Sequence, residues 1–167
     1  MLATNIGQAH IESLNLVVKG HDYGWPIREG TFVIKPDTDL NNVYAPSLSD
    51  RAIPTTQPVA QYDHDEGKAI SGGFQYEGKA VPELQGKYLF GDVPTGRLFY
   101  VDVADLQSGK QATIKEWHVS MHKKQQSLRE LCGSDRVDLH FGKDKDGEIY
   151  ILTKPDGKIY KLVQLAK

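Results

Sequence analysis

The sequence has little of what marks a disulfide scaffold, a membrane protein or a nucleic-acid binder. It contains one cysteine, Cys132, which has no partner within the chain for an internal disulfide. It has no apolar run of the roughly 18 to 20 residues that a membrane-spanning helix needs. Its 20 lysines and arginines nearly balance 22 aspartates and glutamates, without a basic block. We therefore predict no membrane span and no nucleic acid partner, since nucleic-acid binding depends on clustered positive charge.

Several functional signatures are also missing. There is no P-loop, no dinucleotide fingerprint and no Gly-x-Ser-x-Gly motif. The N-terminal stretch lacks the basic start and continuous apolar run of a secretion signal. The 167 residues suffice for one sizeable core, because a chain of this length buries roughly 70% of its unfolded surface. We expect one compact unit.

What the sequence has is short apolar runs that alternate every two residues and are separated by Gly, Pro and Asp, as β-strands and tight turns require. Residues 137–142, 148–153 and 158–163 predict three consecutive antiparallel strands. Residues 69–76, 87–92, 97–103 and 112–119 predict a four-stranded meander. Both groups share a Gly-x-Leu/Ile-aromatic strand start, at Gly96 and Gly147, and a period near 50 residues with about four strands indicates propeller blades.

The predicted fold class is therefore all-β, a partial β-propeller of about two to two and a half four-stranded antiparallel blades. Propellers close with about four to eight blades, so we expect either missing upstream blades or copies that assemble. The chain is read as a single partial propeller unit, 1–167, in five segments. These are strands of an incomplete blade (1–35), a proline-rich loop or insertion (36–58), a full blade (59–119), an excursion with one or two helical turns (120–134) and an incomplete blade (135–167).

Four segments in order resemble the C-terminal portion of the PQQ-dependent soluble sugar dehydrogenases, the glucose/sorbosone dehydrogenase family of six-bladed propellers. They are 12–26 (ESLNLVVKGHDYGWP), 72–78 (GGFQYEG), 82–92 (PELQGKYLFGD) and 144–153 (DKDGEIYILT). The resemblance implies an oxidoreductase acting on sugars (aldoses) with PQQ and calcium, in the periplasm or secreted. It also implies a histidine base, which matches no residue here, so no catalytic residue is predicted and the chain alone is expected to be inactive.

The resemblance further implies candidate ligand residues. The loop before the Asn15-Leu16 strand would hold calcium through Gly7, Gln8 and Glu12, whose carbonyl and carboxylate oxygens suit a hard cation. The alternative is that Glu12 is an ordinary strand residue. Arg97 and Arg136 are the cations closest to the positions where the family binds PQQ, although the family's lysine and paired arginines are not reproduced. We predict weak or absent PQQ binding by this chain alone.

Two more polar loops remain. His64 lies among three carboxylates and a lysine in residues 62–68, where the family lines its cofactor cleft, and the alternative is a hydrated loop whose aspartates cap turns. The Asp144-x-Asp146-Gly147 run echoes an EF-hand but lacks its later ligands, and we interpret it as a blade turn.

Two functions from different classes remain open. The first is a fragment or shortened relative of the dehydrogenase. The second is a non-enzymatic module that self-associates, a trimer of two-blade chains for example, and binds carbohydrate through Tyr23, Trp25 and Tyr62.

Overall fold

The computed structural model describes residues 1–165, which group into two compact units. The first comprises Met1–Ala69 with Leu106–Ala112, and the second comprises Ile70–Asp105 with the chain from Thr113 onward. From the sequence we expected one unit, because strand patterns along a chain do not show which strands share a core. The helices of the described part are far too short and polar to cross a membrane.

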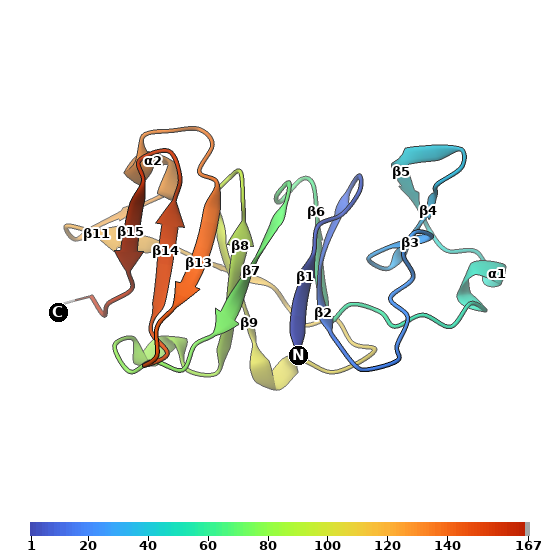
Figure 1. The fold of residues 1–167 in the computed structure, drawn as a ribbon, viewed down its shortest axis with the longest axis horizontal. Coiled ribbons are helices and arrows are strands. Elements are labelled where there is room, and N and C mark those ends of the chain that lie inside the picture. The colour runs from blue at the N-terminus through green and yellow to red at the C-terminus, as the bar shows by residue number, and fades with distance from the viewer. Residues whose placement is uncertain (166–167) are drawn as a thin grey trace. The chain divides into compact units, whose positions relative to one another are not determined.

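Both units are built from short antiparallel strands and a few helical turns (Figure 1). The strands are β1 Leu2–Asn5, β2 Ile11–Leu16, β3 Arg28–Glu29, β4 Phe32–Lys35, β5 Asp39–Tyr44, β6 Ala60–Asp63, β7 Ile70–Gln75, β8 Lys87–Asp92, β9 Leu98–Asp102, β10 Lys115–Trp117, β11 Val119–Met121, β12 Lys124–Gln126, β13 Leu139–Lys143, β14 Ile149–Thr153 and β15 Lys158–Lys161. The helices are α1 Leu48–Arg51, α2 Leu128–Cys132 and the 3-10 turns Pro82–Leu84 and Val103–Asp105.

The first unit contains two three-stranded sheets, β1-β2-β6 and β3-β4-β5. Strand β6 pairs with β2, with Leu14 opposite Ala60 and Ile11 opposite Asp63. The segment 59–119 therefore does not form one sheet, because its first strand joins the sheet of β1 and β2. Strand β2 is buried along almost its whole length, including Glu12, Ser13 and Asn15.

The region 36–58 is more ordered than the loop that we predicted. Strand β5 pairs with β4, and Ser47 caps the N-terminus of α1. The Ser47 hydroxyl accepts a hydrogen bond from the Asp50 amide, and the Asp50 carboxylate accepts one from the Ser47 amide. The prolines lie outside these two elements, so they bound them without interrupting them. The proline and polar residues of this region do not form a strand pattern. Strand β5 was therefore not predicted, and it forms by pairing with β4.

The second unit contains the predicted meander, a sheet in the order β10-β9-β8-β7. Between β7 and β8 the register shifts from Ser71 to Phe74, which is a β-bulge. A Cβ on Gly73 would lie 1.7 Å from the Leu89 carbonyl oxygen, so the bulge brings two backbones closer than any side chain allows.

The C-terminal strands also form as predicted, in a three-stranded sheet β13-β14-β15. The excursion 120–134 contains the helix α2, which starts with a capping box at Ser127, as we expected of this segment. The residues before it form the hairpin β11-β12 rather than a helical turn, because His122 and Lys123 adopt positive φ and reverse the chain.

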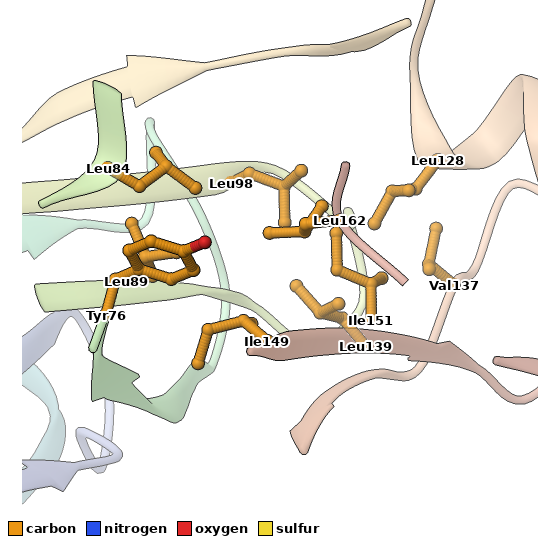
Figure 2. Close-up of a cluster of buried hydrophobic side chains, with 10 residues drawn as sticks. All are labelled: Tyr76, Leu84, Leu89, Leu98, Leu128, Val137, Leu139, Ile149, Ile151 and Leu162. Atoms are coloured by element: carbon orange, nitrogen blue, oxygen red, sulfur yellow. The ribbon is translucent and has the colours of Figure 1, made fainter. Parts of the chain in front are cut away.

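The core of the second unit is a cluster of ten buried residues from β8, β9, β13, β14 and the segments around them (Figure 2). Leu89, Leu139 and Ile149 are fully buried, and Ile151 is 1% exposed. Strand β13 packs against β7 and β8, so this cluster joins the two sheets into one body.

Candidate functional site

A buried carboxylate, Glu12, is the centre of the polar cluster in the first unit. Its residue is 0% exposed on β2, and its Oε1 lies 3.2 Å from His64 Nε2 and 3.3 Å from the Gly7 amide nitrogen, which donates to it. The structure thus brings together three residues that the sequence had placed in two separate candidate sites. Gln8 is exposed and does not join them.

A second buried carboxylate, Glu29, was missed by the sequence analysis. It is 2% exposed and accepts hydrogen bonds from three consecutive amides, those of Ala9 (3.1 Å), His10 (2.6 Å) and Ile11 (2.6 Å). Consecutive N–H groups that converge on one anion form a nest, and here the anion is supplied by the chain itself. No sequence signal marks Glu29, because the nest is formed by a loop about 20 residues away in the sequence.

Loop 7–11 is held tightly over these two carboxylates. A Cβ on Gly7 would lie 2.3 Å from the Ile11 carbonyl oxygen and 2.6 Å from Glu29 Oε1, so only glycine fits. The His10 ring centroid lies 5.8 Å from that of His64, and His10 Nε2 is 2.8 Å from the Asn41 carbonyl oxygen. Two imidazoles and two buried carboxylates therefore share this end of the unit.

The rest of the His64 loop caps its own turn. The Asp63 amide donates to Glu66 (3.1 Å), and the Asp65 amide donates to the Asp63 carboxylate (2.9 Å). Lys68 donates to the His64 carbonyl. These contacts lie within the turn itself, whereas His64 Nε2 contacts the buried Glu12 carboxylate.

The two carboxylates of this cluster contact nitrogen groups. Glu12 contacts an amide and an imidazole, and Glu29 accepts hydrogen bonds from three amides, whereas calcium takes about six to eight oxygen ligands. Among residues 1–165, no three His, Cys, Asp or Glu side chains gather so that they could hold a metal ion.

The two arginines predicted to bind a cofactor lie in the second unit, and each is paired with a carboxylate. Arg97 makes a two-pronged contact with Glu116, at 2.9 and 2.7 Å, and lies over the Phe99 ring. This contact lowers the pKa of the Glu116 carboxyl. Arg136 Nε donates to Asp138 at 2.6 Å, and its side chain is 69% exposed.

Residues 144–147 form the turn that we predicted, and this turn joins β13 to β14. The Asp144 carboxylate accepts hydrogen bonds from the amides of Asp146 and Glu148, both at 2.9 Å. Glu148 is buried, and it accepts from the amides of Lys79 and Ala80 and from the Tyr76 hydroxyl. The hydrogen bond from the Lys79 amide lowers the pKa of the Glu148 carboxyl most, and the hydrogen bond from the Tyr76 hydroxyl lowers it further.

The three aromatics expected to meet carbohydrate differ in their exposure. Trp25 is 60% exposed, while Tyr62 is 5% exposed and belongs to the core. The Tyr23 hydroxyl donates to the Leu16 carbonyl (2.9 Å) and accepts from the Val18 amide (2.8 Å), which fixes a corner of the chain. Of the three, Trp25 offers an open ring.

Comparison with known proteins identifies the family of this chain. The family model for glucose/sorbosone dehydrogenase matches residues 1–161. The HIPL1 protein of Arabidopsis thaliana is 24% identical over 98% of this chain, and the HIPL2 protein of the same plant is 28% identical over 55%. The chain spans 24% of the length of HIPL1.

Solved structures show the same fold. A glucose dehydrogenase aligns with 99% of this chain at a TM-score of 0.64 and 20% identity, and the chain covers 40% of it. The PQQ-bound aldose sugar dehydrogenase from Streptomyces coelicolor aligns with 94% at a TM-score of 0.52 and 18% identity, and 35% of it is covered. The all-β fold is thus a partial β-propeller, as predicted, and the chain belongs to the glucose/sorbosone dehydrogenase family.

Proposed function

We propose that this chain is one part of a PQQ-dependent sugar dehydrogenase-like oxidoreductase and has no dehydrogenase activity alone. The observation that carries the proposal is the family match over nearly the whole chain, together with its coverage of 40% of a similar glucose dehydrogenase. The chain would contribute propeller sheets, and the histidine base would come from residues outside it. By family resemblance the complete enzyme would act on aldoses in the periplasm or outside the cell.

The residues present do not fit PQQ. When bound in an enzyme, this quinone accepts the hydride removed from the sugar, and its three carboxylates need cationic partners. Arg97 is engaged by Glu116 and Arg136 by Asp138, so either arginine would have to break a charge-assisted bond to bind the cofactor. This supports the proposal that the isolated chain does not hold PQQ.

Calcium binding at Gly7, Gln8 and Glu12 stays a prediction from the resemblance. The Glu12 carboxylate is the hard ligand in that set, but it already has His64 and Gly7 as neighbours. We propose that any calcium held there needs further oxygen ligands from outside the described residues.

The test is a titration of the purified 167-residue chain with PQQ in the presence of calcium, followed by isothermal calorimetry and by dye reduction with a panel of aldoses. We expect neither saturable PQQ binding nor dye reduction. Turnover above a PQQ-only blank would refute the proposal that the chain alone is inactive. An Arg97→Ala variant is the matched control, because binding through this guanidinium would be weakened by its removal.

The second candidate function is a self-associating module that binds carbohydrate, and two observations favour it. The sheet β13-β14-β15 has three strands where β7–β10 has four, and Trp25 is exposed. The trimer was predicted from two blades in each chain. With the sheets β1-β2-β6, β7–β10 and β13–β15 as blades, a six-bladed ring would need two chains instead. Sedimentation equilibrium distinguishes a monomer, a dimer and a trimer.

A further inference from the structure

Arg28 is a buried cation without a carboxylate partner. The residue is 5% exposed at the start of β3 in the first unit, and its Nη2 donates to the Asp50 carbonyl. None of the ion pairs within residues 1–165 includes Arg28, and its Nε is buried there without a hydrogen-bond partner. Because an unpaired charge away from water is costly, a buried guanidinium calls for a compensating anion.

The acidic groups around Arg28 are engaged by other parts of the chain. The Asp50 carboxylate accepts from the Ser47 amide at 2.8 Å and from the Ser47 hydroxyl at 2.6 Å. These hydrogen bonds lower the pKa of the Asp50 carboxyl most, and the more distant charge of Arg28 lowers it less. The Asp22 carboxylate accepts from an amide at 2.7 Å, and Glu29 is held in its nest. In the described part of the chain Nη1 of the guanidinium has no partner and, unlike Nε, is not fully buried, so it can meet an anion from outside.

Exposed apolar side chains lie near this cation. The hydrogen bond from Arg28 joins the 22–28 turn to α1, and the Thr56 amide donates to the Asp22 carbonyl at 2.7 Å, so residues 22–28 lie beside residues 50–56. None of the α1 residues is buried. Large apolar side chains of these segments are exposed by 37% to 87%, and they are Trp25, Ile27, Leu48 and Ile53. Tryptophan and arginine are enriched at the centres of protein interfaces, so this composition is typical of an interaction surface.

We propose that Arg28 and these four side chains, the Arg28 surface, bind a segment of another polypeptide that carries a carboxylate between apolar residues. The carboxylate would form a charge-assisted pair with the guanidinium, and the apolar residues would cover the exposed tryptophan and aliphatic groups. A second copy of the chain is a poorer occupant, because a symmetric contact through the same surface would bring a second unpaired cation instead of an anion. This binding needs no cofactor and is independent of the proposed oxidoreductase role.

The first test measures stability, because a partner-binding role and a structural role of Arg28 predict opposite results. Arg28→Met keeps an unbranched side chain and removes the unpaired charge. The Asp50 carbonyl also accepts from the Ile53 amide at 3.2 Å, so the substitution does not leave it unpaired. Thermal melting is followed through Trp25 in a Trp117→Phe background, which leaves one tryptophan, in the first unit. We expect the variant to melt within about 4 °C of its background or higher.

The second test identifies what the Arg28 surface binds. A phage-displayed library of short random peptides is selected on the full chain and counter-selected on the Arg28→Met variant. We expect the enriched peptides to carry aspartate or glutamate flanked by apolar residues. A consensus peptide with a fluorescein label, titrated by fluorescence anisotropy, should lose about tenfold or more in affinity when its carboxylate is changed to an amide.

Two further variants of the chain locate the binding surface. Trp25→Ala leaves Arg28 in place and tests the apolar part separately, and it should weaken binding of the consensus peptide about tenfold or more. Ile159→Ala is the matched control, because it truncates a similarly exposed apolar side chain of the second unit, and it should leave the affinity unchanged.

Four results overturn the proposal. The first is a melting temperature lowered by more than about 4 °C in Arg28→Met, since the chain itself would then compensate the charge. The second is a selection that yields no peptides or peptides without a carboxylate. The third is an affinity that the amide peptide or Trp25→Ala leaves unchanged. The fourth is self-association of the chain that Trp25→Ala abolishes, since the occupant would then be a second copy.

Discussion

The core of the second unit allows a matched test, because two isoleucines on adjacent strands of one sheet differ in burial. Ile151 on β14 is 1% exposed, whereas Ile159 on β15 is 66% exposed. Replacing Ile151 by alanine removes three carbon groups from the cluster in Figure 2, at about 0.8 kcal/mol each. Incomplete closure of the cavity adds about 1 to 2 kcal/mol. The expected loss is about 3.5 to 4.5 kcal/mol in the free energy of unfolding. Ile159 is already about two-thirds exposed, so Ile159→Ala loses only about a third of the free energy of burying those carbon groups. The expected loss in unfolding free energy is below about 1 kcal/mol.

The assay is urea unfolding followed by tryptophan fluorescence in a Trp25→Phe background, so that Trp117 reports on the second unit. Trp117 packs against the core cluster of the second unit. Trp25 is exposed and belongs to the first unit, so replacing it by phenylalanine should leave the stability of the second unit unchanged. The midpoint should fall for Ile151→Ala with little change in the m-value. If both alanine variants lose the same free energy within about 0.5 kcal/mol, Ile151 is not in a core and the reasoning fails.

Three further predictions concern the glycine contacts and the buried carboxylates. Gly73→Ala should cost about 2 kcal/mol or more in unfolding free energy, because its Cβ would meet the Leu89 carbonyl oxygen at 1.7 Å, whereas Gly142→Ala, with nothing nearer than 3.6 Å, should cost less than about 1 kcal/mol in the same urea assay. Glu29→Gln should speed hydrogen exchange at the His10 and Ile11 amides, which donate to that carboxylate, and unchanged exchange would argue against the nest. The lowered pKa of Glu148 stabilises the fold at pH above its ordinary value of 4.5, and this stabilisation is lost as pH falls through the folded value. The stability gap between the wild type and Glu148→Gln, measured by thermal melting, should therefore narrow below about pH 4.5, and a constant gap would contradict this account.

Much of the strand pattern could be predicted from the sequence. The four runs of the meander and the three C-terminal runs alternate with period two and are separated by Gly, Pro and Asp, so local sterics fix both the strands and the turns. The hairpin at 149–161 needs nothing beyond its neighbours in sequence. The partial propeller followed from this spacing together with the family resemblance.

The pairing of β6 with β2 could not be predicted, because 43 residues separate Leu16 from Ala60 and contain a complete second sheet. The strand β5 was hidden for a related reason. Half of its residues Asp39–Tyr44 are polar and none of them is buried, so their strand conformation depends on pairing with β4. In both cases the strand forms because a partner strand distant in sequence, or one with a stronger pattern, supplies its backbone hydrogen bonds.

The sequence by itself determined which residue types were available at the candidate site. Together with the family resemblance, it pointed to Gly7 and Glu12 in one loop and to His64 in another. Only the tertiary structure decided that these three meet, that Glu29 anchors loop 7–11, and that Arg97 and Arg136 are taken up by carboxylates. The physical reason is range. Turn and strand preferences act between residues a few positions apart, whereas a buried carboxylate must find donors wherever the fold brings them, because leaving it unpaired away from water is costly.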